Sequence, residues 1–423
     1  MYWLLIIVLI IFLIIDIKLD KNFITPIKIY NILWFVLILL YQLNLSYIQT
    51  TLSNRTLFIF WIFTIFYNMF YYLFYYETNK NNKYNEKENI KKYKITTRDF
   101  NNEKIIKIVD IFFIAMFIIE IIIEKGFPLL FRLQGKGSNY LSFGIPSIHG
   151  LLNTIAMLLG AYYLLKKGWH KYIYIIFAVM TISRQVLITI FVEGVVVYII
   201  QNGSKISNSR NQRRKILILT IIVIVMFTAI GNFRSGNDVM DIVFRPKPQY
   251  TNLPTSVMWF YSYLEFSISN FNHLVSMTDG GVNYGTSMLN FFMPSALEKL
   301  FSISENFTEK YIITDNFNVS TWYPEIYLDF GIFGIVIFAI FLAWFGNYLY
   351  KKAMLYKNDR YSLLYAIFIH NIFMSFFVNM FIYVSVISQA ILVIILFNKN
   401  EYKSKEKNTE NEQCNVINNC TRI

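Results

Sequence analysis

The segment Tyr172–Ile200, YIYIIFAVMTISRQVLITIFVEGVVVYII, decides how this chain folds. It carries only two charged residues, Arg184 and Glu193, and lysines and arginines flank it on both sides. Because Lys and Arg gather on the cytoplasmic side of a membrane, the segment must cross outward and return. Each leg is then about 14 residues, shorter than the roughly 20 that a spanning helix needs. We therefore expect a broken helical pair whose turn, Ser183-Arg184-Gln185, lies inside the bundle, against protein or a water-filled cavity.

The rest of the chain has the same apolar character. Of its 423 residues, 56% are hydrophobic and 15% charged, whereas a soluble domain carries about 25% charged residues. The apolar residues form long blocks without period-2 alternation, so the spans are helices and not strands of a barrel. The sequence predicts an all-α polytopic membrane protein of about eleven spans, the first retained and not cleaved as a signal peptide. The spans are expected at about 2–15, 27–43, 57–76, 105–123, 148–165, 172–183, 186–200, 216–230, 328–350, 362–378 and 380–397.

The positive charges set the expected orientation. With the N-terminus outside and the C-terminus in the cytoplasm, 29 of the 39 lysines and arginines fall on the cytoplasmic side or at its helix ends, as the positive-inside rule requires. The net charge of +13 then follows from topology and does not indicate nucleic-acid binding. We expect a multi-pass protein of the cytoplasmic (inner) membrane, with residues 1–397 as the membrane domain and 398–423 as a flexible cytoplasmic tail.

The ordered mass outside the membrane is expected on the outer face. Seven of the eight prolines lie there, and proline favours defined turns, so the outer loops 124–147 and 231–327 should be folded. The cytoplasmic linker 77–104 is polar, low in complexity and expected to be flexible. Within the second loop Ser256–Met277 is amphipathic, which predicts a helix at the interface or docked on the bundle instead of a span. Its polar stripe consists of Ser262, Glu265, Ser269, Asn272 and Ser276.

Motifs for several classes of function are absent from the sequence. It has no Walker loop, no Rossmann glycine fingerprint, no HExxH and no CxxC pair, so ATP-driven transport and zinc hydrolysis have no support. Asp238 and Asp241 are spaced DxxD, which is a weak signal for a divalent metal. Cys414 and Cys420 lie in the polar tail without histidines nearby, and we interpret them as incidental thiols. We expect no cofactor and no metal site.

The residues that stand out are cations on the outer side. Arg184 lies in the expected membrane-embedded turn, where an ionisable group is costly and marks function by default; a structural pair with Glu193 is the alternative. Arg132 lies in the first outer loop, and Arg234 and Arg245 open the second. Arginine presents a fixed fork of donors that suits phosphate and pyrophosphate. Each loop arginine alone is more often a solvated charge, so it is their grouping with a buried arginine that indicates an anion site.

Candidates for a proton acceptor are fewer. His273 is the one histidine well inside an outer loop, and it adjoins the polar stripe of the amphipathic helix, although a lone histidine is more often structural. Glu325 and Asp329 flank the entry to the ninth expected span and are equally well placed. The sequence leaves the choice between His273 and Glu325 open, with Asp329 as a further alternative.

The segment Asn318–Gly331, NVSTWYPEIYLDFG, is followed by Gly334 and a long apolar span. It resembles the O-antigen and capsular repeat-unit polymerases, the Wzy family. In that family a threonine and aromatic run leads to a Tyr-x-Asp-Phe-Gly motif that enters a late helix after the main outer loop. The corresponding residues here are Tyr327, Asp329 and Gly331.

Two further stretches extend the resemblance over about residues 170–350. Tyr284-Gly285-Thr286 with Pro294 resembles the glycine and proline stretch that those proteins carry within the same outer loop. Thr181-Ile-Ser-Arg184 resembles the Ser-Arg turn that these polymerases share with O-antigen ligases. Some members also carry an arginine with a glycine eleven residues later. Here Gly144 follows Arg132 one residue too late, so this chain departs from that pattern.

The resemblance implies a glycosyltransferase that joins undecaprenyl-pyrophosphate-linked oligosaccharides at the outer face of the cytoplasmic membrane. A sugar hydroxyl of one molecule attacks the anomeric carbon of the other, and the lipid pyrophosphate leaves. Arginines can stabilise the charge that develops on this leaving group without a metal, and the hydroxyl needs a proton acceptor, here His273 or Glu325. The pyrophosphate bond carries the driving force, in keeping with the missing nucleotide motifs. The candidate pyrophosphate-binding residues are Arg132, Arg184, Arg234 and Arg245.

Three other functions compete with this interpretation. An O-antigen ligase shares the Ser-Arg turn and differs in its acceptor. A flippase or other transporter of lipid-linked sugars typically shows internal repeats, and none is found here. A purely structural assembly partner would not need the buried Arg184. The product of a polymerase would be O-antigen or capsular polysaccharide, and its partners would include a flippase and a chain-length regulator.

Overall fold

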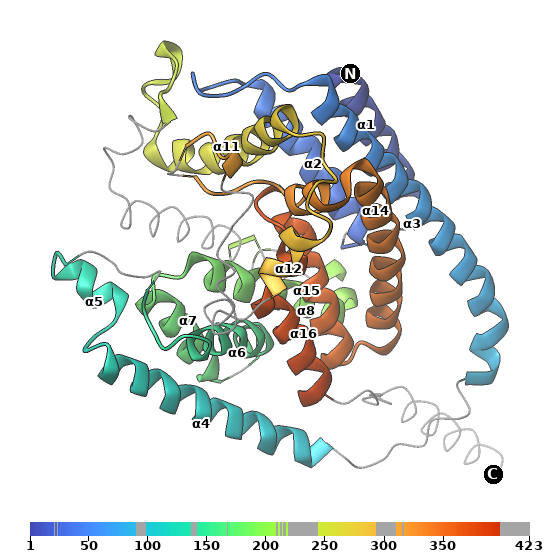
Figure 1. Cartoon of the computed structure of the whole chain (residues 1–423). Coiled ribbons are helices and arrows are strands. Elements are labelled where there is room, and N and C mark those ends of the chain that lie inside the picture. The colour runs from blue at the N-terminus through green and yellow to red at the C-terminus, as the bar shows by residue number, and fades with distance from the viewer. Residues whose placement is uncertain are drawn as a thin grey trace, which may run out of the picture.

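The structure is a computed structural model of the whole chain (Figure 1). It describes residues 1–20, 22, 24–89, 99–136, 142–166, 168–208, 210–211, 214, 217–218, 244–292, 310–314 and 317–397. Within these residues the regular elements are helices, apart from one isolated bridge between Ser46 and Pro246. The helices are α1 Tyr2–Leu19, α2 Pro26–Gln42, α3 Asn54–Asn89, α4 Asp99–Ile123, α5 Pro128–Leu133, α6 Ile148–Tyr163, α7 His170–Met180, α8 Arg184–Asn208, η1 Pro248–Tyr250, α11 Thr255–Met277, α12 Thr286–Phe292, α14 Pro324–Tyr356, α15 Asp359–Phe373, η3 Met374–Phe376, η4 Met380–Ile382 and α16 Val384–Leu396.

The helices bear out an all-α protein with membrane-spanning character. Four are long and apolar enough to cross a membrane: α1, the first part of α3, α8 up to Gly203, and α14. Three shorter apolar helices, α2, α7 and α16, accompany them. Ten of the eleven expected spans coincide with a helix, and most of the remaining one, 216–230, lies outside the described residues. The number of spans and their orientation stay predictions.

The expected linker 77–104 is partly helical. Helix α3 continues to Asn89, well past the end of its apolar part, and α4 already begins at Asp99. The residues between them, like the tail 398–423, lie outside the described part of the chain. The two helices therefore extend into a segment that composition alone marks as linker.

An aromatic core joins α2 and α3 to the start of α14. The ring of Trp322 stacks on Tyr30 at 6.0 Å between centroids and meets Phe63 at 5.0 Å. The neighbouring Tyr323 meets Trp34 at 5.5 Å, and both Trp322 and Tyr323 are fully buried. Large aromatic side chains contribute much of a core's burial energy. Trp322 and Tyr323, directly before α14, therefore anchor that helix between α2 and α3.

Segments that were expected on the same side of the membrane lie together. At one end the Tyr41 hydroxyl, at the end of α2, is 2.8 Å from the Ser269 hydroxyl on α11. At the other end the Tyr350 hydroxyl, near the end of α14, donates to the Asp20 carboxylate at 2.7 Å, just after α1. This grouping agrees with the expected alternation of helices. The side of the membrane that each end faces stays a prediction from the distribution of charge.

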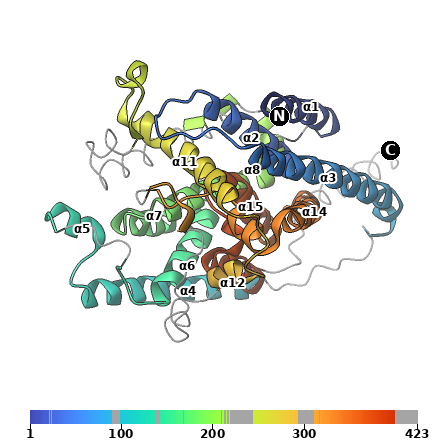
Figure 2. The same ribbon diagram turned by 45° about the horizontal axis from the view of Figure 1, so that its top comes forward.

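Helix α11 lies across one end of the neighbouring helices (Figures 1 and 2). Four of the five residues of its polar stripe, Ser262, Glu265, Ser269 and Asn272, are buried against the protein, and the fifth, Ser276, is exposed. The Asn272 side-chain oxygen accepts hydrogen bonds from the Ser53 N–H and the Thr56 hydroxyl, both at 2.8 Å. Of the two positions that the sequence left open for this helix, the structure shows the docked one. The stripe is polar because it meets helix ends and connecting backbone, where hydrogen bonds are available.

Candidate functional site

The helix break expected around Arg184 is present. Helix α7 ends at Met180 and α8 begins at Arg184, so the break covers residues 181–183, two residues earlier than the turn 183–185 predicted from sequence. Between them Ile182 has a φ of +53°, which is a genuine outlier for a β-branched residue. Such a conformation costs about 1–3 kcal/mol, and strain of this kind clusters at ligand sites. The geometry of the turn therefore supports a functional role for this segment.

Arg184 is buried beneath α11. Only 7% of the residue is exposed, and its guanidinium carbon lies 5.6 Å from the centroid of the Tyr263 ring and 6.0 Å from that of Trp259. Cation–π contacts of this kind contribute about 0.5–2 kcal/mol each. Arg184 is also the first residue of α8, and the N-terminus of a helix carries the positive end of its dipole. The guanidinium and the helix dipole therefore both attract a bound anion at this point.

Glu193 does not pair with Arg184. Nine residues of helix separate the two, a rise of about 13 Å. Glu193 instead lies with Oε1 3.4 Å from Nδ1 of His370 on α15, and its Oε2 accepts a hydrogen bond from the Gln389 amide on α16. The alternative of an Arg184–Glu193 structural pair is therefore wrong. Glu193 belongs to a separate polar contact deeper along α8.

The segment 374–383 connects the start of α8 to the start of α14. The Gln185 amide, next to Arg184, donates to the Met380 sulfur at 3.6 Å. The backbone N–H of Trp322 donates to the Ser375 carbonyl at 2.9 Å. One short segment thus contacts both elements that the sequence analysis singled out. Residues 374–383, called the connector below, therefore contact both the neighbour of the buried arginine and the Asn318–Gly331 motif.

Glu325 is the second residue of α14 and is almost fully buried, with 6% of the residue exposed. Its Oε2 accepts no hydrogen bond from a described residue. The carboxyl interacts electrostatically with Tyr383, at the end of the connector, and with Asp329 one turn further along α14. Buried polar atoms are usually hydrogen-bonded, and an exception calls for an explanation such as a ligand or a catalytic role. Glu325 therefore remains a candidate.

The Tyr-x-Asp-Phe-Gly motif has a structural explanation. Gly331 interrupts α14 with φ +61° and ψ −150°, a conformation that is essentially restricted to glycine. The carbonyls of Tyr327 and Leu328, ahead of the break, accept the N–H groups of Gly281 and Val282 at 2.9 and 2.8 Å. These two hydrogen bonds hold the loop that follows α11 against the first turns of α14, an arrangement called the clamp below.

Asp329 completes this clamp. Its two carboxylate oxygens accept the backbone N–H groups of Ser287 and Met288 at 3.0 and 2.9 Å, and the residue is 1% exposed. These donors belong to the first turn of α12, where an aspartate satisfies N–H groups that have no partner within the helix. Because both oxygens accept backbone N–H groups of this turn, Asp329 acts as a helix cap.

The other predicted arginines in the described residues lie on different elements from Arg184. Arg245 directly follows Phe244, whose ring meets the Tyr261 ring at 5.8 Å between centroids. Tyr261 points about 200° around α11 from Tyr263, the residue that contacts Arg184. Phe244 and Arg184 therefore contact opposite faces of α11. Arg132 lies on the short helix α5 and is half-buried. Arg234, with the DxxD pair, lies outside the described residues. The grouping of cations therefore stays a prediction.

His273 lies on the same helix as the Arg184 contacts but away from them. Ten residues of helix, about 15 Å, separate it from Tyr263. A different acid on α11 stands out: burial raises the pKa of Glu265 to about 8, and the Ser46 hydroxyl and the Lys247 ammonium offset only part of this effect. The sequence marked Glu265 as part of the polar stripe without separating it from its neutral neighbours.

The structure also pairs two residues that the sequence analysis did not connect. Nδ1 of His149, in the first turn of α6, lies 2.9 Å from Oε2 of Glu120, near the end of α4. Glu120 is fully buried, while 19% of the His149 side chain is exposed. Nothing in the sequence pointed to this pair beyond the presence of a histidine and a glutamate, which are 29 positions apart.

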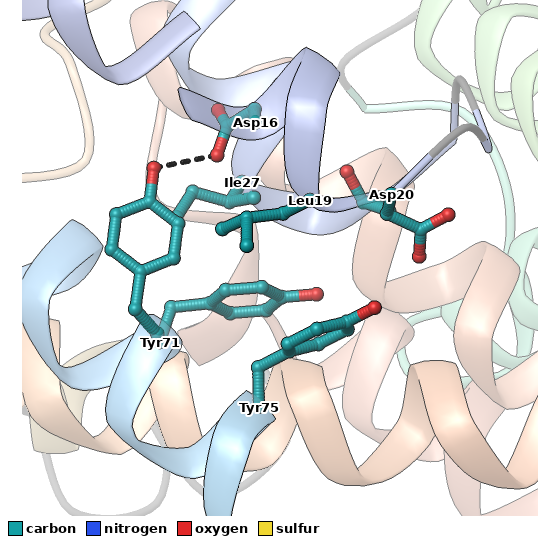
Figure 3. Close-up of a pocket in the computed structure, with 8 residues that line it drawn as sticks. Asp16, Leu19, Asp20, Ile27, Tyr71 and Tyr75 are labelled. Atoms are coloured by element: carbon teal, nitrogen blue, oxygen red, sulfur yellow. Dashed lines mark hydrogen bonds between the residues drawn. The ribbon is translucent and has the colours of Figure 1, made fainter. Parts of the chain in front are cut away.

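A small pocket lies at the opposite end of the molecule (Figure 3). Part of its polar lining is satisfied within the protein: the Asp16 carboxylate accepts hydrogen bonds from the Tyr72 hydroxyl at 2.6 Å and the Asn31 amide at 2.8 Å, whereas the buried hydroxyls of Thr25 and Tyr71 form no hydrogen bond with a described residue. Tyr71 and Tyr75 close its other side. This network is a buried polar contact among α1, α2 and α3, and it offers no cluster of acid, base and cation for catalysis. No group of metal-ligating side chains is found among the described residues.

The chain was compared with known proteins at the level of families, individual sequences and structures. No protein family, curated protein or solved structure matches it. The resemblance to the Wzy family therefore rests on the order and placement of the short motifs described above. The structure adds the buried Arg184 at a helix break, connected through 374–383 to the start of α14.

Proposed function

We propose that this chain is a polymerase that joins lipid-pyrophosphate-linked oligosaccharide repeat units into a surface polysaccharide. The proposal places it in the cytoplasmic membrane with the reaction at the outer face. Undecaprenyl pyrophosphate is the lipid that the resemblance implies, and O-antigen or capsule is the product. The observation that carries the proposal is Arg184, buried at the first residue of α8 beneath the aromatic face of α11.

The burial of Arg184 suits the leaving group of this reaction. As the glycosidic bond to the pyrophosphate breaks, negative charge grows on the phosphate oxygens. A guanidinium and a helix N-terminus that are already fixed in a water-poor site stabilise this charge without reorganisation, which is commonly a large part of catalysis. Such a site also favours an anion that is tethered at the depth of the lipid headgroups.

The aromatic residues around Arg184 fix its direction. Tyr263 packs against Phe377 of the connector at 5.2 Å between ring centroids. The backbone N–H of Trp322 donates to the Ser375 carbonyl of the same connector at 2.9 Å. A ligand that moved Arg184 would therefore also displace the connector and the start of α14. This coupling links the pyrophosphate end of the proposed site to Glu325, the carboxylate that the sequence analysis named as a possible proton acceptor.

Removal of the gene from its own cells, followed by complementation, tests the proposed function. Loss of a polymerase leaves single repeat units on the final acceptor and no long polymer. Loss of a ligase leaves polymer on the lipid pyrophosphate, and loss of a flippase leaves single units exposed to the cytoplasm. The proposal predicts the first pattern, restored by the wild-type chain; either of the other two patterns contradicts it.

A further inference from the structure

The pairing of His149 with Glu120 provides a base that the sequence did not reveal. The Glu120 carboxylate is fully buried and accepts two hydrogen bonds, from Nδ1 of His149 at 2.9 Å and from the N–H of Ile145 at 3.1 Å. With its Nδ1 proton held by the carboxylate, the imidazole carries its lone pair on Nε2. Nε2 makes no hydrogen bond to a described residue, and the side chain is 19% exposed. This orientation suits a general base.

The ring of His149 is also held in place by its neighbours. Phe143 meets it edge-on at 5.4 Å between centroids, and Phe177 on α7 lies at 5.9 Å. A side chain added at Gly144, whose φ is +94°, would come within 2.7 Å of the His149 ring. The residues from Phe143 to His149 therefore close tightly around the imidazole. A fixed ring with one free nitrogen is pre-organised for proton transfer.

The packing of α6 on α8 places this base near Arg184. A side chain added at Gly160 would touch Ile190, and one added at Gly194 would touch Leu164. The two helices thus run parallel, with residues about 30 positions apart side by side, so Arg184 lies level with residue 154. His149 is about 7.5 Å further toward the N-terminal ends, on a helix whose axis is about 8–10 Å away. The backbone positions of His149 and Arg184 are then about 12 Å apart, a separation that one glycosyl pyrophosphate can bridge.

We propose that His149, oriented by Glu120, is the general base of the transfer reaction; this rests on the proposed function. Nε2 of His149 takes the proton of the acceptor hydroxyl as that oxygen bonds to the anomeric carbon. The bond from the anomeric carbon to the lipid pyrophosphate breaks, and the pyrophosphate leaves with both electrons next to Arg184. Glu120 stabilises the imidazolium, which then returns its proton to water. Glu120 is thus a positioning residue.

The test uses the purified full-length protein and lipid-linked repeat units extracted from cells that lack it. Release of lipid pyrophosphate and growth of polymer are measured for wild type, His149→Gln and Glu120→Gln. General-base catalysis contributes about 10²–10⁴-fold, so His149→Gln should lower kcat by this factor with little change in KM. Glu120→Gln should lower kcat less. His170→Gln is the matched control, because His170 also faces an aspartate, Asp110 at 3.4 Å, at the other end of the helices.

Azide separates a base from a structural residue, because this anion attacks carbon without losing a proton. Azide should restore lipid pyrophosphate release by His149→Gln at least 10-fold and give a glycosyl azide, with no such gain for Arg184→Ala. Wild-type activity in His149→Gln overturns the inference. A folded but inactive His149→Gln that azide fails to rescue also overturns it. Both outcomes leave the proposed function standing. If His149→Gln does not fold, Glu120→Gln decides by the same azide gain. A wild-type protein that releases no lipid pyrophosphate refutes the proposed function itself.

Discussion

Gly331→Ala tests whether the Tyr-x-Asp-Phe-Gly motif is a structural clamp. At φ +61° and ψ −150°, residue 331 occupies a region that is essentially closed to other residues. A Cβ at this position would have room, because its nearest neighbour would be the backbone nitrogen of Gly281 at 3.6 Å. The cost is therefore backbone strain, about 1–3 kcal/mol. If residue 331 relaxes to a helical conformation instead, the two bonds from Gly281 and Val282 to α14 carbonyls are strained or lost.

The assay for this prediction is the thermal stability of the detergent-solubilised protein. Gly203→Ala is the matched control, since Gly203, which directly follows the break in α8 at Asn202, is exposed and a Cβ there meets nothing within 4 Å. Alanine is favoured over glycine within a helix by about 0.5–1 kcal/mol, so this control should be neutral or slightly stabilised. Gly331→Ala should melt clearly below wild type. Equal melting of Gly331→Ala and Gly203→Ala would refute the assignment of positive φ and the clamp built on it.

Three further predictions concern topology, pH and the proton acceptor. A reporter fused after Phe397 should show cytoplasm and one inserted at Asn252 the outer side; the same side for both would contradict the charge-based orientation. The raised pKa of Glu265, about 8 instead of 4.5, means that the folded state holds this proton more tightly than the unfolded state. The stabilisation that the protonated Glu265 gives the folded state is then lost between about pH 5 and 8, by up to ~1.4 kcal/mol per pH unit. The melting temperature of wild type relative to Glu265→Gln should therefore fall over this range. Parallel melting curves of the two proteins against pH would speak against the raised pKa. Because the base is assigned to His149, His273→Ala should polymerise near the wild-type level, and abolished polymer in a well-expressed His273→Ala would return the assignment to the outer loop.

The parts of the fold that were predictable from sequence depend on composition and charge along the chain. The break before Arg184 followed from two basic flanks around legs too short to cross, and the docking of α11 from polar residues at helical spacing. The role of Asp329 was not predictable, because it depends on N–H groups 41 and 42 residues away. An aspartate before a Phe-Gly pair has the same sequence signature whether it caps a helix or takes a proton.

The candidate site was predicted only in part for the same reason. Arg184 stood out because a buried cation between apolar legs is costly wherever it packs. Its aromatic neighbours, Trp259 and Tyr263, are ordinary members of an aromatic-rich chain until α11 docks on α8. Proximity in sequence offered Arg184 as an alternative partner for Glu193, whereas its contacts come from His370 on α15 and Gln389 on α16. These contacts depend on tertiary packing, which spacing along one helix does not report.

The most direct test of the central claim measures lipid pyrophosphate release from lipid-linked repeat units by purified wild-type, Arg184→Lys and Arg184→Ala proteins of equal thermal stability. Removal of one donor to a developing charge costs about 10²–10³ in rate, so Arg184→Ala should fall by at least this factor. Lysine keeps the charge but loses the fork of donors, so Arg184→Lys should lie between the two. A folded Arg184→Ala protein that releases lipid pyrophosphate at the wild-type rate would contradict the account.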